Sequence, residues 1–324
     1  MATHAFVTGA SGKVASVLIP RLIEAGHTVT GMVRTEAKAA AVRAHGATCV
    51  VGDLANPTAV DEGLAGARIV FHLAGGMRGR GTETPDRINR LGTLSLLDRI
   101  EHAGRLQSIV FASSGAVYGD RAGERVADGA TPSPHTRYGA SKVAAEQALE
   151  SAHRRGVPVR VARLAAVYGP GFPYLLEKWI RSGRAWLPGD GTNIVPTVHI
   201  DDAVTALMLL ATTSAKHLHY NVADRTPMTV RTFYGAVARA IGGSPPRHWS
   251  PLLPDAISVT AARLNERLQS RIARRPRFTP DAIRLMTASV QMDTRRLAED
   301  LAMQWAHPSA EQGLCAVFER SERG

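Results

Sequence analysis

The first residues of this 324-residue chain hold its most constraining feature, an apolar segment that runs directly into a glycine-rich turn. Residues 5–8 have the composition of a buried strand, and the next seven residues read G-A-S-G-K-V-A. Gly9 and Gly12 let the chain turn tightly and let a pyrophosphate approach the start of a helix predicted for residues 14–25. The third small position is Ala15, where glycine is usual, and alanine still permits close helix packing. A strand, a turn of this kind and a helix in this order predict an α/β fold that binds a dinucleotide.

Three further apolar segments, residues 27–33, 48–51 and 68–73, predict the next strands. The first of them ends at Arg34, where a site specific for NAD usually has Asp or Glu. A carboxylate there binds the ribose hydroxyls, whereas a guanidinium attracts a 2′-phosphate. Arg34 therefore favours NADP(H), and the alternative is NAD, with Arg34 stacked on adenine or facing water. Asp53, after the third predicted strand, is placed to meet the adenine.

A second chemical pattern follows a short strand predicted for residues 109–111. Ser113 and Ser114 lie at the exit of this strand, at the edge where α/β sheets place their chemistry. Ser114 is expected to hold the substrate oxygen while a proton and a hydride move, a contact of the oxyanion-hole type. Ser113 is the second choice for this role.

Tyr138 and Lys142 lie four residues apart at the opening of an alanine-rich helix predicted for residues 141–152, so their side chains face the same way. An ammonium beside a phenol is expected to lower the phenol pKa from its usual value of about 10. Tyr138 would then serve as a proton donor or acceptor. A surface tyrosine and lysine on a helix is the alternative, so this prediction depends on the cofactor site.

Composition limits the remaining possibilities. With 44% hydrophobic residues the chain can build an ample core, and its length suits one dinucleotide-type domain with a smaller second lobe. No apolar run approaches the ~20 residues that span a bilayer, and the N-terminus lacks a signal-peptide pattern. Only Cys49 and Cys315 occur, which fits a reducing cytoplasm. The net charge is +11, but aromatics are 5% and no nucleic-acid module is present, so we expect a basic surface that attracts an anionic cofactor.

Together the motifs resemble those of the extended short-chain dehydrogenase/reductase family, which includes epimerases, dehydratases and reductases. Further matching segments appear in family order: G-D-L, H-L-A-G, I-N-R-L-G-T, S-S-G-A-V-Y-G, Y-G-A-S-K, V-Y-G-P-G, P-G-D-G, V-H-I-D-D-A and Y-N-V-A-D. The resemblance fades after about residue 242. It implies a Rossmann-type doubly wound parallel sheet with a smaller, mostly helical substrate lobe. The implied Rossmann domain comprises residues 1–171 and 193–224, and the lobe comprises residues 172–192 and 225–324.

The resemblance also implies a role for each matching position. Tyr138 matches the catalytic acid/base, Lys142 its partner that also binds the nicotinamide ribose, and Ser114 the hydroxyl that polarises the substrate. Asn89 matches an asparagine that supports the region of the lysine; alternatively it makes a hydrogen bond within its helix. The residues expected to bind the cofactor are Gly9, Ser11, Gly12, Lys13, Val14, Arg34, Asp53, Leu54, Leu73, Ala74, Gly75, Asn89, Tyr138, Lys142 and Leu164.

His199, Asp201 and Asp202 have residue types that bind metals. In the family this segment is structural and positions the lobe against the Rossmann domain. We therefore expect neither a metal nor catalysis there.

The departures from the family pattern bear on the substrate. Members that act on sugar nucleotides commonly show R-P-x-N-V-Y-G-P, in which the asparagine contacts substrate, but Ala165 and Ala166 replace the proline and asparagine here. They also commonly carry R-D-F, with an arginine near the diphosphate, where this chain has Val195, Pro196 and Thr197. Losing these polar groups favours a less charged substrate. Apolar and aromatic residues are candidates for the wall of a ketone or alcohol pocket, or for the ordinary core of the lobe: Phe172, Tyr174, Leu175, Trp179, Trp186 and Leu187.

These observations predict an NADP(H)-dependent oxidoreductase of the ketoreductase or alcohol dehydrogenase type, acting on a carbonyl or carbinol of a small organic molecule. The direction is not encoded, although NADP preference favours reduction. The alternatives are an NAD-dependent nucleotide-sugar epimerase or dehydratase, and a non-catalytic protein that responds to NADP. We expect no nucleic-acid or membrane partner, and the resemblance leaves a homodimer open. A stripe of arginines in the tail predicts a solvated face or a surface for a partner or anionic ligand: Arg263, Arg267, Arg271 and Arg275.

Overall fold

The computed structural model describes residues 3–77, 84–103, 106–170, 174–183, 185–187, 189–248, 260 and 279–321. Several sequence predictions fall outside the described residues and side chains: the arginine stripe, Phe172, Tyr174, Leu175 and Trp186. In the part of the chain that is described, no helix combines the length and apolar character needed to cross a membrane.

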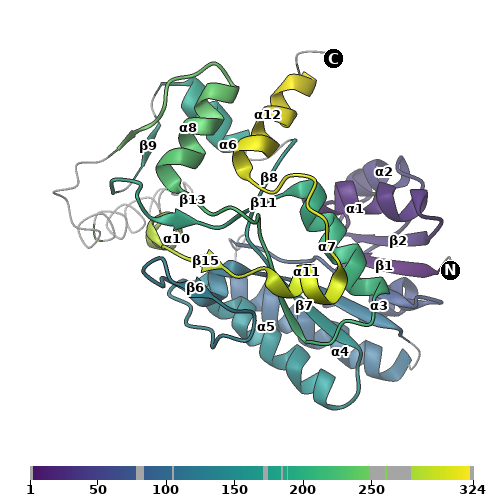
Figure 1. Ribbon diagram of the computed structural model, residues 1–324. Helices are drawn as coiled ribbons and strands as arrows, with labels where there is room; N and C mark the ends of the chain where they lie inside the picture. Colours follow the sequence, from purple (N-terminus) through teal and green to yellow (C-terminus); the bar gives the residue numbers. More distant parts are fainter. Residues whose placement is uncertain are drawn as a thin grey trace.

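A seven-stranded parallel sheet forms the centre of the protein (Figure 1). Its order is β12-β7-β5-β4-β1-β2-β3, so the order of the strands reverses between β1 and β4. In open α/β sheets this reversal creates a crevice at the carboxyl ends of the strands, where ligands bind. The strands are β1 (His4–Thr8), β2 (Thr28–Val33), β3 (Thr48–Val51), β4 (Ile69–His72), β5 (Ser108–Ser114), β7 (Val159–Leu164) and β12 (His219–Val222).

Helices cover both faces of the sheet, which explains why its strands are almost continuously apolar. One apolar core lies under α1 (Lys13–Glu24), α2 (Glu36–Arg43) and α7 (Ile200–Thr212), with α11 (Arg295–Leu301) beside α7. The opposite core lies under α3 (Pro57–Leu64), α4 (Gly92–Ala103) and α5 (Arg137–Arg154). Two short turns lead into this second layer: η1 (Arg87–Leu91), a single π-helical turn before α4, and η2 (Gly115–Tyr118), a 3₁₀ turn after β5. The three layers confirm the predicted Rossmann-type fold class.

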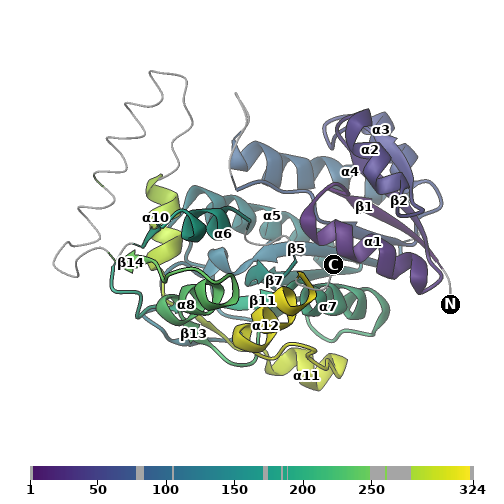
Figure 2. The ribbon, with the colours of Figure 1, turned by 90° about the horizontal axis from the view of Figure 1, so that it is seen from above.

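A smaller, mostly helical unit lies to one side of the sheet (Figures 1 and 2). Its own apolar core joins α6 (Tyr174–Arg181), α8 (Val230–Ala240) and α12 (Ala310–Ser321), and includes Ile180, Phe233 and Leu314. Short strand pairs lie outside the central sheet. They are β8 (Ala166–Tyr168) with β11 (Thr197–His199), β9 (Trp186–Leu187) with β14 (Arg247–His248), β10 (Ile194–Val195) with β13 (Met228–Thr229), and β6 (Arg125–Val126) with β15 (Gln291–Met292), which follows α10 (Pro280–Thr287). The predicted domain boundaries stay a prediction.

Candidate active site

The glycine-rich turn connects β1 to α1. Gly9 has φ +68°, and a Cβ atom at this position would lie 2.8 Å from the backbone nitrogen of Ala74. Only glycine permits so close an approach of the two backbone segments. Gly12 donates its N–H to the Gly9 carbonyl oxygen at 2.8 Å and precedes α1 without a side chain that caps the helix. The first N–H groups of α1 have no partner within the helix, and Ser11 and Lys13 are exposed beside them, so this cradle fits a pyrophosphate.

Four more predicted cofactor residues lie near this turn. Arg34 is exposed and directly follows β2, the neighbour of β1, so it occupies the same edge of the sheet as the turn. Asp53 is also exposed, and its carboxylate accepts a backbone N–H two residues further on at 2.9 Å. Val14 and Leu54 are apolar and pack against the two cores of the sheet. Arg34 and Asp53 are therefore the exposed polar residues at this edge of the sheet. Val14 and Leu54 connect the edge to the apolar cores.

The segment after β4 brings the cofactor edge next to Lys142. Leu73, Ala74 and Gly75 follow this strand, and a Cβ atom on Gly75 would lie 3.1 Å from both Lys142 Nζ and Asn89 Oδ1. Leu164, at the end of β7, pairs in register with Ser114. These residues share one edge of the sheet because the strands are parallel.

Ser114 and Tyr138 lie on two elements that pack directly against each other. Ser114 ends β5, and its Oγ accepts the N–H of Ala116 at 3.2 Å. Thr136 caps α5 by accepting the Gly139 N–H at 3.0 Å, which places Tyr138 in the first turn of the helix. A Cβ atom on Gly139 would lie 2.5 Å from the Ala116 carbonyl oxygen, so glycine allows the two turns to touch. This packing brings the Tyr138 phenol to Ser114, whose hydrogen bonding lowers the phenol pKa.

Lys142 is 4% exposed and is held against β5. Its Nζ donates to the Ala112 carbonyl oxygen at 2.7 Å and lies 4.5 Å from the centre of the Phe111 ring. Burial lowers the pKa of Lys142 from its usual 10.5 to about 8, and the negative charge of Glu146 opposes this shift. The ammonium is thus partly destabilised by its surroundings.

The pKa of Tyr138 is raised, because burial of the phenol outweighs its hydrogen bond with Ser114. The sequence-based expectation that Lys142 lowers this pKa is therefore wrong for this structure. The physical reason is the burial of the phenol, which is the largest contribution to the shift, whereas the charge of Lys142 is not among its causes. A phenol with a raised pKa stays protonated at neutral pH but is a weaker acid, so proton donation by Tyr138 requires that nearby positive charge stabilise the phenolate that forms.

Asn89 joins the segment after β4 to α5. Its Oδ1 accepts the Gly76 N–H at 2.9 Å, and its Nδ2 donates to the Gly76 carbonyl oxygen at 3.1 Å and to Ser141 Oγ at 2.8 Å. Ser141 immediately precedes Lys142. Of the two sequence interpretations, support of the lysine region matches these contacts, and a hydrogen bond within its own helix does not.

Comparisons with known proteins agree with this geometry. The model of the "NAD dependent epimerase/dehydratase family" matches residues 5–223. This chain belongs to that family. Two curated relatives resemble it over most of their length. The 4-hydroxy-2-methyl-3-oxo-4-farnesyl-3,4-dihydroquinoline-1-oxide ketoreductase of Stigmatella aurantiaca is 31% identical over 70% of either chain, and a 2-alkyl-3-oxoalkanoate reductase of Stenotrophomonas maltophilia is 30% identical over 79% of either chain.

Among solved structures, MoeE5 in complex with UDP-glucuronic acid and NAD superposes with a TM-score of 0.75 at 26% identity, covering 99% of both chains. The family match and these relatives identify the protein as an NAD(P)-dependent oxidoreductase of the extended short-chain dehydrogenase/reductase type.

A buried ion pair behind the site was missed by the sequence analysis. Arg163 and Glu146 have side chains that are each 2% exposed, and Arg163 Nη2 donates to Glu146 Oε2 at 2.7 Å. Glu146 also accepts a hydrogen bond from Ser113, which removes this serine from the cleft and leaves Ser114 beside Tyr138. One signal was present in the sequence: Glu146 follows Lys142 by one helical turn, and Arg163 interrupts an apolar strand.

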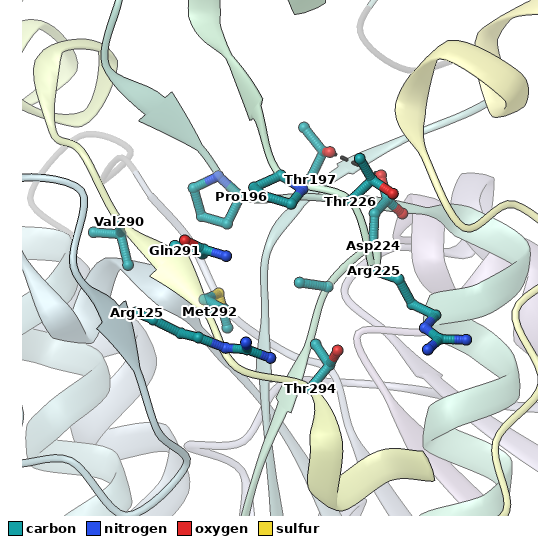
Figure 3. Close-up of a pocket in the computed structure, with 12 residues that line it drawn as sticks. Arg125, Pro196, Thr197, Asp224, Arg225, Thr226, Val290, Gln291, Met292 and Thr294 are labelled. Atoms are coloured by element: carbon teal, nitrogen blue, oxygen red, sulfur yellow. Dashed lines mark hydrogen bonds between the residues drawn. The ribbon is translucent and has the colours of Figure 1, made fainter.

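A separate, shallow recess lies where β6 and β15 meet the segment after β12 (Figure 3). Arg125, Gln291, Met292 and Thr294 are among its walls. Its lining includes no predicted cofactor residue and none of the serine, tyrosine and lysine described above. Met292 lies next to the turn after Ser114, since a Cβ atom on Gly115 would lie 2.9 Å from Met292 Sδ. We therefore assign the recess no part in cofactor binding.

The segment with His199 links α7 to the chain before α12. Asp202 accepts the backbone N–H groups of Ala306 and His307 at 2.8 and 2.9 Å, and the His199 ring lies 3.9 Å from the His307 ring. Candidate ligand atoms of His199, Asp201 and His307 lie within 4.8 Å of one another. The contacts of Asp202 fit the structural role that the family resemblance implied. The absence of a metal there stays a prediction.

Proposed function

We propose that this protein is an NADP(H)-dependent ketoreductase in which Ser114, Tyr138 and Lys142 carry out the proton transfer. The observation that carries the proposal is the packing of the first turn of α5, with Tyr138, on the turn after Ser114 at the cofactor edge of the sheet. A ketone oxygen bound between two hydroxyls receives a hydrogen bond from one and a proton from the other. The nicotinamide, when bound, supplies the hydride.

Each of the three side chains has a distinct task. Tyr138 is protonated at neutral pH and donates this proton to the oxygen as the carbinol forms. Ser114 orients the phenol and the substrate oxygen, because its own position is fixed by the hydrogen bond from the Ala116 N–H. Lys142 places a buried positive charge between β5 and Gly75, which favours negative charge that develops nearby during the reaction.

The substrate class follows from what the chain lacks and from its relatives. Ala165 and Ala166 stand where sugar-nucleotide members have proline and asparagine. The Thr197 hydroxyl, in the segment where those members have R-D-F, donates to Asp224 at 2.8 Å and is occupied. A sugar nucleotide would leave its diphosphate unpaired in such a pocket. An uncharged or singly charged ketone carries no diphosphate and avoids this cost. Since two relatives are named for the reduction of ketones, we propose a 3-oxoacyl or cyclic ketone as substrate.

One assay separates this function from its alternative. The purified protein is incubated with NADPH and a panel of 2-alkyl-3-oxo acids and cyclic ketones, and in parallel with UDP-glucose and UDP-glucuronic acid. Consumption of NADPH with one carbinol formed per NADPH supports the proposal. Conversion of a UDP-sugar without net consumption of NADPH would contradict the proposal and identify the protein as an epimerase or dehydratase.

The choice of NADP rests on Arg34, an exposed residue that directly follows β2. Arg34→Asp is expected to weaken NADPH binding about ten- to a hundredfold, because a charge-assisted contact to the 2′-phosphate is replaced by repulsion. NADH binding should stay equal or become tighter, since a carboxylate accepts from the ribose hydroxyls. Dissociation constants of both nucleotides, measured by quenching of protein fluorescence, check this prediction. An equal loss of affinity for NADPH and NADH would show that Arg34 does not contact the 2′-phosphate.

A further inference from the structure

A histidine that the proposed mechanism does not use is buried at the end of β4. His72 is 1% exposed, and it occupies the register position beside Thr8 of β1 and Phe111 of β5. Its Nδ1 lies 2.8 Å from Thr8 Oγ1, and its Nε2 lies 2.9 Å from Thr93 Oγ1 of α4. Buried polar atoms without access to water must satisfy one another, so these short contacts define where each hydrogen lies.

These contacts form a chain of hydrogen bonds from Ala74 to Asn89, and the direction of each bond follows from the two ends of this hydrogen-bond chain. At one end, the Thr93 hydroxyl donates to the Asn89 carbonyl oxygen at 2.6 Å, so its oxygen accepts from His72 Nε2–H. Nδ1 of the neutral ring then has a lone pair and accepts from the Thr8 hydroxyl. At the other end, Thr8 Oγ1 accepts the Ala74 N–H at 3.2 Å. Every donor and acceptor of this chain is used only when His72 is the neutral Nε2–H tautomer.

The two ends of this hydrogen-bond chain lie in the segments that border the cofactor edge. Ala74 is the residue whose backbone contacts the Gly9 turn, and Asn89 holds Gly76 and the Ser141 side chain next to Lys142. The histidine ring also lies 5.2 Å from the Phe111 ring, over which the Lys142 ammonium sits. One buried ring thereby ties β1, β4, η1 and α4 together behind the cleft.

We propose that His72, as its neutral Nε2–H tautomer, is a positioning residue for the nicotinamide nucleotide: the chain Ala74–Thr8–His72–Thr93–Asn89 holds the segment after β4 against the Gly9 turn. The inference rests on the proposed function only in taking this nucleotide as the ligand. Burial together with the Lys142 charge lowers the pKa of His72 to about 3, so the ring stays neutral wherever the protein is folded near neutral pH.

The experiment compares two matched threonine variants. Thr93→Val removes the hydroxyl that His72 donates to while keeping the shape of the side chain. Thr30→Val is the control, because Thr30 is also buried in the sheet and bonded to a histidine, His4, at 3.0 Å, but not at the cofactor edge. Thermal midpoints are measured alongside dissociation constants for NADPH and NADH, without any ketone present.

Thr93→Val is expected to weaken binding of both nucleotides about tenfold, whereas Thr30→Val lowers the thermal midpoint to a similar extent and leaves binding unchanged. His72→Gln, which keeps an N–H donor toward Thr93, should lose less affinity than His72→Phe. In the unmodified protein labelled with ¹⁵N-histidine, the nitrogen chemical shifts should report Nε2 as protonated and Nδ1 as bare.

Three results would overturn the inference: a protonated Nδ1 with a bare Nε2, unchanged nucleotide affinity in Thr93→Val despite a lower thermal midpoint, or absence of nucleotide binding by the unmodified protein. The first two leave the proposed ketoreductase function standing. Conversely, a protein that shows the predicted tautomer and affinities but reduces no ketone would contradict the function and leave this inference intact.

Discussion

Replacement of Tyr138 by phenylalanine is expected to lower kcat for ketone reduction by about 10²–10⁴-fold, the usual contribution of a positioned acid or base. The change removes only the phenol oxygen, so the ring still fills its place in the first turn of α5. The dissociation constant for NADPH should change less than threefold, because the glycine-rich turn and Arg34 are untouched. Steady-state rates of NADPH oxidation and equilibrium binding of NADPH, measured on the same preparation, check both parts.

A second tyrosine provides the control for this variant. Tyr234 lies in α8, packed at the edge of the lobe core, and is not hydrogen-bonded to Ser114. Tyr234→Phe should therefore retain most of the activity. Rates of Tyr138→Phe that match those of the unmodified protein would refute the proton-transfer role, and equal losses in both variants would point to a general effect on the fold.

Replacement of Lys142 by methionine is expected to increase stability at neutral pH while it removes activity. The lysine costs free energy in the folded state, because burial lowers its pKa from 10.5 to about 8. That shift corresponds to an upper bound of about 3 kcal/mol, at roughly 1.4 kcal/mol for each pKa unit. Losing the hydrogen bond to the Ala112 carbonyl oxygen offsets roughly 1–2 kcal/mol of this gain. Lys142→Met should therefore raise the free energy of unfolding at pH 7 by about 1–2 kcal/mol.

The pH dependence of this difference has a definite sign. Below pH 8 the lysine is protonated in both the folded and the unfolded state, so the cost is constant. Between pH 8 and 10.5 the unfolded state binds the proton and the folded state has lost it, so the unmodified protein gains stability as the pH rises. The difference in stability should thus change by about 3 kcal/mol over this interval, so that the unmodified protein becomes more stable than Lys142→Met near pH 10.5.

Urea unfolding at a series of pH values measures the effect of Lys142→Met. Lys216→Met serves as the control, since Lys216 has a side chain that is 73% exposed and contributes little. A stability difference for Lys142→Met that is independent of pH would contradict the lowered pKa of Lys142.

Much of the fold follows from local sequence patterns, because buried parallel strands are continuous apolar runs. The strand predicted for residues 48–51 has those bounds in the structure, and the first strand begins one residue earlier than predicted, as His4–Thr8. The helix predicted for residues 141–152 begins at Arg137 instead, because Thr136 caps it. The apolar pattern alone did not reveal that cap, which is what places Tyr138 inside the helix.

The features that sequence reasoning missed depend on contacts between distant segments. Glu146 and Arg163 pair across the space between α5 and β7, and His72 bonds to threonines that are 64 and 21 residues away in the chain. No local periodicity encodes such pairs. The direction of the Tyr138 pKa shift was missed for the same reason, since it depends on the burial of the phenol in the folded protein.

Transfer of deuterium from nucleotide to product tests the central claim most directly. The protein is incubated with a 2-alkyl-3-oxo acid and NADPH that carries deuterium on the transferred position of the nicotinamide, and the product is examined by mass spectrometry and NMR. We expect a carbinol with one deuterium at the former ketone carbon. The rate of its formation should fall about 10²–10⁴-fold in Tyr138→Phe. A carbinol without deuterium, or a UDP-sugar converted while the labelled NADPH remains unconsumed, would contradict the account.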